Sequence, residues 1–285
     1  MRIIHFSDTH LTDKISDFSG YFDKRLIGYA NFILTRHGKF PVERLQNAIY
    51  EIVSLNPEIV VCTGDIVSLS EPAEFDKFIE ICSPLLENEN IHFLYVPGNH
   101  DAYVKRTAPY LQKAFRVLNQ NKFKMSDMPV IKKIRNLSFF LANESIPTNI
   151  FLSCGYLNSK IKEKFQDWIF SNREPNEKRI LVGHYPCFMS NGKPLSWRRS
   201  LKGYSIVADA LKDNQLDLLL CGHIHQPYIN QYGKTMEICS GSLTMNGVFN
   251  IIDINPTSGK IDQYWQTVNS GDTLETSMEI PPFPA

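Results

Sequence analysis

Five short polar segments, each directly after an apolar run, hold five of the eight histidines of this chain. Loops that follow strands are where open α/β folds collect catalytic groups. We therefore expect the five segments to converge on one site. The apolar runs predict β-strands, and they lie at residues 3–6, 59–62, 93–96, 180–182 and 218–221. The polar segments are Asp8-Thr9-His10, Gly64-Asp65, Gly98-Asn99-His100-Asp101, Gly183-His184 and Gly222-His223-Ile224-His225.

Two of these segments contain pairs of ligand-type residues separated by one residue. The pairs are Asp8 with His10 and His223 with His225. Residues two apart on extended backbone point to the same side, so we expect both members of each pair to point to one side of the chain.

The remaining segments supply the other ligand types that two metal ions need. Asp65 has a carboxylate that can bridge two ions, Asn99 offers a neutral oxygen, and His184 offers another imidazole. Mixed imidazole and carboxylate sites suit manganese, iron, zinc, cobalt or nickel. Glycine precedes four of the segments, which predicts close backbone approach there.

The ordered motifs D-x-H, G-D, G-N-H-D, G-H and G-H-x-H over residues 8–225 resemble the calcineurin-like metallophosphoesterase superfamily. The resemblance implies an α/β fold: a two-sheet β-sandwich flanked by helices, with a dinuclear metal site at the C-terminal ends of the strands. It implies two divalent metal ions, Mn²⁺ foremost and Fe, Zn, Co, Ni or Mg as alternatives, with a metal-bridging hydroxide as the nucleophile. One ion would be held by Asp8, His10, Asp65 and His225, and the other by Asp65, Asn99, His184 and His223.

The same resemblance assigns roles to the two residues that end the third segment. His100 would stabilise the transition state or protonate the leaving oxygen, and Asp101 would orient the His100 imidazole. Many members of the superfamily have a second aspartate three residues after the G-D aspartate. This chain has Ser68 at that position, so we expect no carboxylate there to support the metal ligands.

The predicted elements form one phosphoesterase domain at residues 1–268, followed by an extended tail at 269–285. After residue 225 we expect strands and no further helix. Helices are predicted near residues 42–55, 72–86, 108–120, 158–171 and 204–213. Further strands are predicted near residues 137–142, 234–239 and 247–254. The apolar stripe of the first helix is Val42, Leu45, Ala48, Ile49, Ile52 and Val53.

Residues 13–40 form an aromatic and basic insertion between the first motif and the first helix. Either a helix packed on the domain or a flap that meets an acyl chain or a membrane surface fits this composition. In the flap alternative Lys24, Arg25 and Asn31 contact substrate. The stretch F-x-K-R-x-x-G-x-x-N, from Phe22 to Asn31, is similar to bacterial enzymes that cleave UDP-2,3-diacylglucosamine.

A second candidate substrate wall follows the fourth motif, at residues 190–200. Trp197, Arg198 and Arg199 could stack on a base or bind a diphosphate, although a solvated loop fits the sequence equally well.

Three functions follow from these features. The first is a UDP-2,3-diacylglucosamine diphosphatase of lipid A synthesis, which the apolar insertion favours. The second is a 3′,5′-cyclic nucleotide phosphodiesterase, which shares the motifs but needs a small polar pocket. The third is a catalytically inactive metal-binding scaffold, which the complete set of ligand types disfavours.

The composition limits which partners and which cellular compartment we expect. The 30 basic and 30 acidic residues cancel, which disfavours nucleic acid as a partner. We expect a phosphorylated small molecule or a lipid nucleotide as substrate, with a peripheral membrane contact as an option; the oligomeric state is open. The chain shows no apolar stretch near 18 residues and no room for a signal peptide, and its six cysteines include no Cys-x-x-Cys pair. These features predict a cytoplasmic protein, with the inner-membrane surface as an alternative location.

Overall fold

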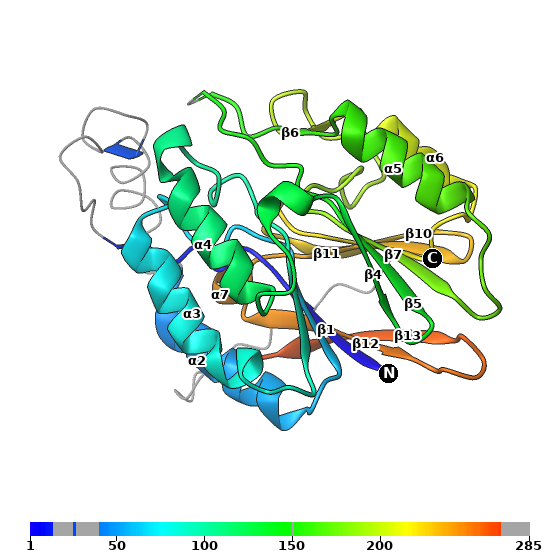
Figure 1. Cartoon of the computed structure of the whole chain (residues 1–285), viewed down its shortest axis with the longest axis horizontal. Coiled ribbons are helices and arrows are strands. Elements are labelled where there is room, and N and C mark those ends of the chain that lie inside the picture. The colour runs from blue at the N-terminus through cyan, green and yellow to red at the C-terminus, as the bar shows by residue number, and fades with distance from the viewer. Residues whose placement is uncertain (14–24, 27–39, 150, 269–285) are drawn as a thin grey trace.

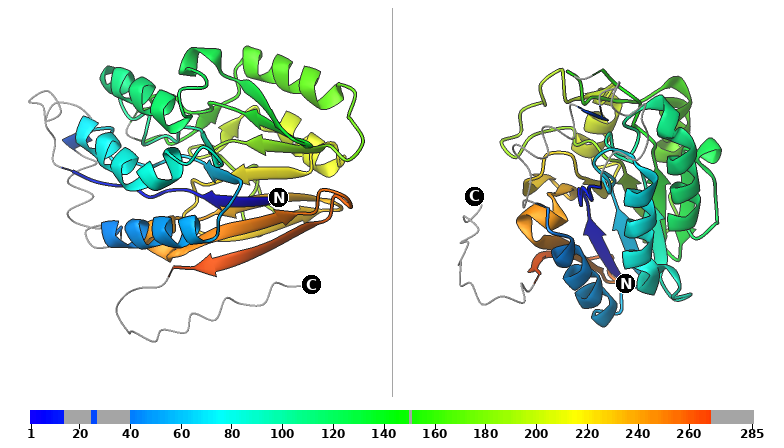
Figure 2. Two further views of the ribbon diagram at one scale, coloured as in Figure 1. Left: turned by 60° about the horizontal axis from the view of Figure 1, so that its bottom comes forward. Right: turned by 90° about the vertical axis from the view of Figure 1, so that its left-hand side faces the viewer.

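The computed structural model describes residues 1–13, 25–26, 40–149 and 151–268. Its main body is two β-sheets stacked face to face with helices on the outside, as Figures 1 and 2 show. This arrangement is the two-sheet sandwich that the motifs imply. The tail at 269–285 and most of the insertion at 13–40 lie outside the described residues.

The first sheet has five strands in the order β13-β12-β1-β2-β3. Strands β1, β2 and β3 are parallel neighbours, whereas β12 and β13 join antiparallel at one edge. The three parallel strands therefore end at the same edge of the sheet. The strands are β1 (Arg2–Phe6), β2 (Ile59–Cys62), β3 (His92–Tyr95), β12 (Val248–Ile254) and β13 (Ile261–Thr267).

The second sheet has six strands in the order β10-β11-β9-β7-β5-β4. Its central strands β5, β7, β9 and β11 are parallel, and β4 and β10 are antiparallel edges. The strands are β4 (Val130–Ile134), β5 (Leu137–Leu141), β7 (Lys178–Val182), β9 (Leu218–Cys221), β10 (Pro227–Tyr232) and β11 (Thr235–Ser240). A separate pair, β6 (Gly155–Tyr156) and β8 (Leu201–Lys202), joins two loops.

Alternate residues of the second sheet face two different cores. Phe139 and Ile180 pack with the first sheet, whereas Phe140 and Leu181 pack against helices α5 and α6. Strands buried on both faces need apolar residues at successive positions, which explains why these runs are continuous and not alternating.

Helices cover the outer faces of both sheets. Helices α2, α3 and α4 lie side by side over the first sheet, and α5 and α6 lie over the second (Figure 1). The helices are α2 (Val42–Ser54), α3 (Pro72–Leu86), α4 (Ala108–Leu118), α5 (Ser159–Phe170), α6 (Ser205–Lys212) and α7 (Leu243–Asn246). Short 3₁₀ turns occur at Lys105–Thr107 and Met125–Asp127. No helix among the described residues combines the length and the apolar character needed to cross a membrane.

The predicted helices and strands are confirmed to within a few residues. Strands β4, β6 and β8 were not predicted. Residues after 225 do contain a helix, α7, and four strands follow that point instead of two. Val53 does not belong to the buried stripe of α2, because its side chain is 38% exposed. All six cysteines are buried and free, as expected.

Candidate metal centre

The predicted ligands leave the ends of strands from both sheets. Strands β1, β2 and β3 of the first sheet lead to Asp8 with His10, to Asp65 and to Asn99. In the second sheet, β7 leads to His184, and β9 leads to the pair His223 and His225. The site therefore lies where the carboxyl ends of two stacked sheets meet, which fixes each loop against a rigid strand.

The backbone of the paired ligands differs from the extended conformation that we expected. Asp8 and His10 have φ values of 55° and 47°, and His223 and His225 have 70° and 57°. Asp65, with a φ of 52°, also lies in the left-handed region. This conformation is costly for residues other than glycine, and such strain persists where surrounding contacts hold it. Asp8 and His10 approach each other through tight turns and not through strand alternation, whereas His223 and His225 face different ligand groups.

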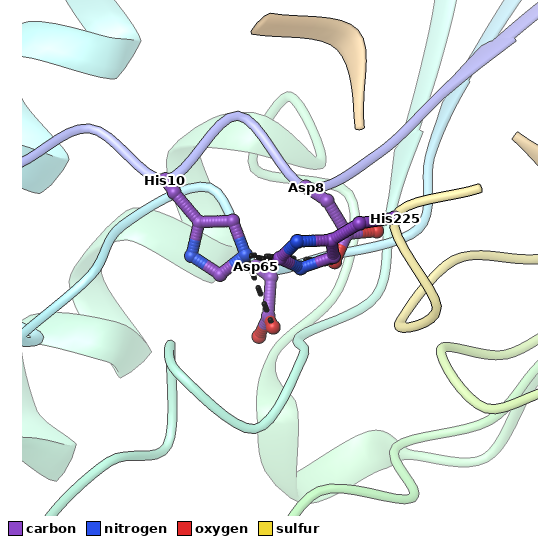
Figure 3. A group of neighbouring side chains, drawn as sticks. All are labelled: Asp8, His10, Asp65 and His225. Atoms are coloured by element: carbon purple, nitrogen blue, oxygen red, sulfur yellow. Dashed lines mark hydrogen bonds and ion pairs between the residues drawn. The ribbon is translucent and has the colours of Figure 1, made fainter. Parts of the chain in front are cut away.

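The first ligand group consists of Asp8, His10, Asp65 and His225, which Figure 3 shows turned toward one another. The Nε2 atom of His10 lies 3.6 Å from Asp8 Oδ1 and 3.7 Å from Asp65 Oδ2. His225 Nε2 lies 3.1 Å from Asp8 Oδ1 and 2.9 Å from His10 Nε2. Four ligand atoms thus surround one point.

The second ligand group combines Asp65 with His184 and His223. His184 Nε2 lies 3.5 Å from Asp65 Oδ2 and 3.3 Å from Asn99 Oδ1. The side chain of Asn99 therefore joins the group, as the motifs imply. Asp65 Oδ2 faces histidines of both groups, which is the position of a bridging ligand.

Each carboxylate keeps one oxygen for the centre because the backbone occupies the other. The backbone N–H of His100 donates to Asp65 Oδ1 at 2.7 Å, and that of His223 donates to Asp8 Oδ2 at 2.9 Å. The remaining Asp8 Oδ1 is buried without a hydrogen bond among the described residues. Unsatisfied buried carboxylate oxygens are costly, and a divalent cation is a fitting partner for them.

Backbone groups also orient the imidazoles. The carbonyl of Thr63 lies 2.6 Å from His184 Nδ1. Because a carbonyl only accepts, His184 Nδ1 must carry a proton, which leaves Nε2 as the nitrogen that would bind a metal. Burial acts to lower the pKa of His184, but the Asp65 carboxylate outweighs burial and raises it to about 10, so a metal would displace the proton on Nε2. His223 Nε2 has no hydrogen bond within the described structure. Burial lowers the pKa of His10 to about 3 and that of His223 well below its ordinary value. Both rings are therefore neutral, which is the form that binds metals.

Charge within the site keeps Asp65 ionised. Burial acts to raise its pKa, but the nearby imidazoles of His184 and His100 outweigh burial and hold the pKa below its usual range. The donor set of carboxylates, neutral imidazoles and an amide oxygen fits two divalent ions.

Two glycines make this convergence possible. A Cβ at Gly98 would overlap the Asp65 carboxylate, and one at Gly222 would overlap Ser7 and the Asp8 carboxylate. The expectation of close backbone approach at these positions is confirmed.

His100 lies beside the first ligand group. Its Nδ1 is 2.8 Å from the carbonyl of Ser68, its ring lies 4.8 Å from that of His10, and Tyr103 stacks on it at 5.1 Å. Ser68 therefore does support the site, through its backbone carbonyl and not through its side chain.

Asp101 has a different role from the expected orientation of His100. Its carboxylate accepts the backbone N–H groups of Asp65, Ile66 and Gly98, at 2.8 to 2.9 Å, and the hydroxyl of Tyr95 at 2.9 Å. Asp101 thus fixes the loop that carries the bridging ligand, whereas the Ser68 carbonyl orients His100.

Sequence reasoning missed two supports of the site. The buried Glu144, which follows β5, accepts the backbone N–H groups of His184 and Tyr185 at 2.9 and 3.0 Å. The hydroxyls of Ser242 and Thr244 donate to the carbonyls of Asp8 and Thr9 at 2.6 and 2.8 Å. Like the ligands, Glu144 lies just after a strand, so its position in the sequence could have identified it as part of the site.

Of the substrate contacts predicted in the insertion, the structure describes only Arg25. Arg25 is not available to substrate, because it is fully buried and its Nη1 bonds Glu71 Oε1 at 2.6 Å. It ties the insertion to the start of α3. Lys24 and Asn31 lie outside the described residues.

In the second candidate substrate wall, residues 190–200, Arg199 contacts the site. Arg199 Nη2 lies 3.4 Å from the carbonyl of His223. The Trp197 side chain is 63% exposed, and Arg198 and Lys202 lie over its ring at 5.4 and 5.7 Å.

This fold and this ligand arrangement suit a site for two divalent metal ions. Residues 1–227 match the calcineurin-like phosphoesterase family. The chain belongs to that family. Members of the family normally use a dinuclear divalent metal site, and the candidate ligand cluster lies where such a site belongs.

Individual relatives are distant. A cAMP/cGMP dual specificity phosphodiesterase of Mycobacterium tuberculosis is 23% identical over 225 residues, which are 78% of this chain and 61% of that protein. A 5′-nucleotidase structure from Staphylococcus aureus has a TM-score of 0.56 at 14% identity, over 97% of this chain and 56% of that one. A dimetal phosphatase from Danio rerio has a TM-score of 0.54 at 12% identity, over 94% and 99%. The structural likenesses show the fold.

Proposed function

We propose that the protein uses two divalent metal ions to hydrolyse a nucleotide phosphodiester, with 3′,5′-cyclic nucleotides as the first candidate substrates. The observation that carries the dinuclear site is the position of Asp65 Oδ2, 3.7 Å from His10 Nε2 and 3.5 Å from His184 Nε2. Manganese heads the candidate metals, and iron, zinc, cobalt, nickel and magnesium follow.

The first group of residues, Asp8, His10, Asp65 and His225, would hold one ion. The second group, Asp65, Asn99, His184 and His223, would hold the other. When bound, such ions lower the pKa of water and neutralise phosphate oxygens during an in-line displacement.

His100 supplies the proton chemistry of the chain itself. The Ser68 carbonyl can only accept, so it fixes a proton on His100 Nδ1, and the proposal assigns Nε2 to the leaving group. A protonated Nε2 can donate to the leaving oxygen, which prevents a poorly stabilised alkoxide from forming. The stacked ring of Tyr103 holds the imidazole plane.

The cyclic nucleotide candidate is supported by the mycobacterial relative and by the insertion. Arg25 was one of the cations expected to meet the phosphates of a lipid nucleotide, and it is buried in an ion pair with Glu71. That part of the argument for a lipid substrate is removed.

UDP-2,3-diacylglucosamine remains the second candidate because of one surface. Phe151 and Tyr156 are 72% and 50% exposed, and their segment is joined to that of Trp197 by the bond from Ser153 N to Arg198 O, at 2.9 Å. Exposed aromatic rings on joined loops suit an acyl chain.

Purified, manganese-loaded protein incubated in parallel with 3′,5′-cyclic AMP and UDP-2,3-diacylglucosamine tests the proposal. Release of AMP alone supports it, and release of UMP and acylated sugar phosphate alone supports the second candidate. Bis(p-nitrophenyl) phosphate serves as a general diester. Hydrolysis of that diester alone would reject both substrates and retain the chemistry, whereas no hydrolysis of any of the three would overturn the proposal. Asp76→Ala, on the exposed Lys113 ion pair, is a control variant.

A further inference from the structure

Arg199 is held at the edge of the metal centre by a rigid loop. Its own N–H donates to Ser196 O at 2.9 Å, and the neighbouring carbonyls of Arg198 and Ser200 accept from Ser153 and Gly155 at 2.9 and 3.3 Å. Strands β6 and β8 continue this attachment. The side chain therefore leaves from a fixed backbone, although it is itself exposed.

The guanidinium of Arg199 is largely unused. Within the described residues it makes one hydrogen bond, to the carbonyl of His223, and no ion pair with a carboxylate. A guanidinium has five N–H donors in a planar fork, so most of them are available for a ligand.

The position of Arg199 beside the two ligand groups favours an anionic ligand. Asp8 and Asp65 are the only formally negative members of the two described ligand groups, so two divalent ions would leave the centre with excess positive charge. Arg199 adds to that excess. A phosphate that binds there is attracted by all of these charges and can accept bidentate hydrogen bonds from the guanidinium.

We propose that Arg199 is a substrate-binding residue that holds non-bridging oxygens of the substrate phosphoryl group through its free N–H donors. This assignment rests on the proposed hydrolysis of phosphoesters, but not on which nucleotide is the substrate. The ligand class is a phosphate anion, either a diester or the product phosphate.

The test compares Arg199→Gln with the matched control Arg198→Gln. Arg198 is also exposed and is adjacent in sequence, but its guanidinium lies over the Trp197 ring and not at His223. The measurements are the inhibition constant of inorganic phosphate and the KM and kcat for bis(p-nitrophenyl) phosphate, together with bound metal.

We expect Arg199→Gln to raise the inhibition constant of phosphate and the KM by about tenfold or more, with unchanged metal content. Arg198→Gln should remain within about twofold of the wild type, and Arg199→Lys should recover part of the loss because it keeps the charge without the fork. Three results would each overturn the assignment: an inhibition constant for Arg199→Gln equal to that of the wild type, an equal rise in Arg198→Gln, or loss of metal from Arg199→Gln. This test uses neither 3′,5′-cyclic AMP nor UDP-2,3-diacylglucosamine, so it can be interpreted even if the protein hydrolyses neither of them.

Discussion

The carboxylate of Asp101 accepts the backbone N–H of Asp65 at 2.8 Å, so an acidic side chain that is not a ligand positions the one that bridges both ligand groups. Burial and the charge of Asp65 raise the pKa of Asp101 to about 7. Tyr95 donates to the same carboxylate from the end of β3.

Replacing Asp101 should therefore destabilise the fold. Asp101→Ala leaves the N–H groups of Asp65, Ile66 and Gly98 buried without an acceptor, which costs on the order of 3 kcal/mol or more of unfolding free energy. Tyr95→Phe removes one donor and should cost about 1 kcal/mol. Urea unfolding in the presence of a chelator measures both. A loss below about 1 kcal/mol for Asp101→Ala would contradict the role.

His100→Ala should leave metal binding intact and slow turnover by a factor on the order of 10² to 10⁴. The reason is the proposed role of His100 Nε2 as the acid for the leaving oxygen, with Nδ1 engaged by the Ser68 carbonyl. Turnover rates with a poor and with a good leaving group distinguish acid catalysis from other roles of His100, because protonation by an acid matters most when the leaving group is poor. An unchanged rate with the poor leaving group would remove the acid role.

Glu144 should control the second ligand group. Glu144→Ala deletes the acceptor for the N–H groups of His184 and Tyr185 and should weaken metal binding there by about 10 to 100-fold. Metal titration followed by mass spectrometry should show one ion retained and one lost. The exposed Glu163→Ala, on α5, is the control. Equal loss of both ions would contradict a role confined to His184.

The pH dependence of stability should reveal Glu237, which lies in β11 and accepts the N–H of Cys187 at 2.6 Å. Burial raises its pKa from an ordinary 4.5 to about 7. Between these values the folded state retains a proton that the unfolded chain has released, so stability falls as the pH rises from 4.5 to 7 and stays lower above 7.

Glu237→Gln removes this dependence. The metal-free variant should gain stability relative to the wild type as the pH rises, by a total on the order of 3 kcal/mol, and the difference should be constant above pH 7. Thermal unfolding at pH 5, 6, 7 and 8 with a chelator checks this. The same stability difference at pH 5 and pH 8 would show that Glu237 ionises normally.

Much of the fold could be predicted because the strands that carry the ligands are buried on both faces. Their apolar runs are continuous and stand out from the surrounding sequence. Strand β13 (Ile261–Thr267) was missed because it is an edge strand of half-exposed and exposed positions, and α7 because four residues are too few for a helical period.

The site could be predicted by residue type but not by local conformation. The left-handed backbone at Asp8 and His10 depends on distant contacts, such as the hydrogen bonds from Asp8 N to Gly64 O and from Ser242 Oγ to Asp8 O. The direction of the Asp101 side chain is likewise set by the loops around it, so the role that the resemblance implied for Asp101 differs from the contacts that it makes.

The most direct test of the dinuclear site is the metal content and turnover of Asp65→Ala. Because Asp65 Oδ2 faces both His10 and His184, the variant should lose metal from both positions and lose hydrolysis of bis(p-nitrophenyl) phosphate, while Asp76→Ala keeps both. Retention of two ions or of wild-type turnover by Asp65→Ala would contradict the assignment.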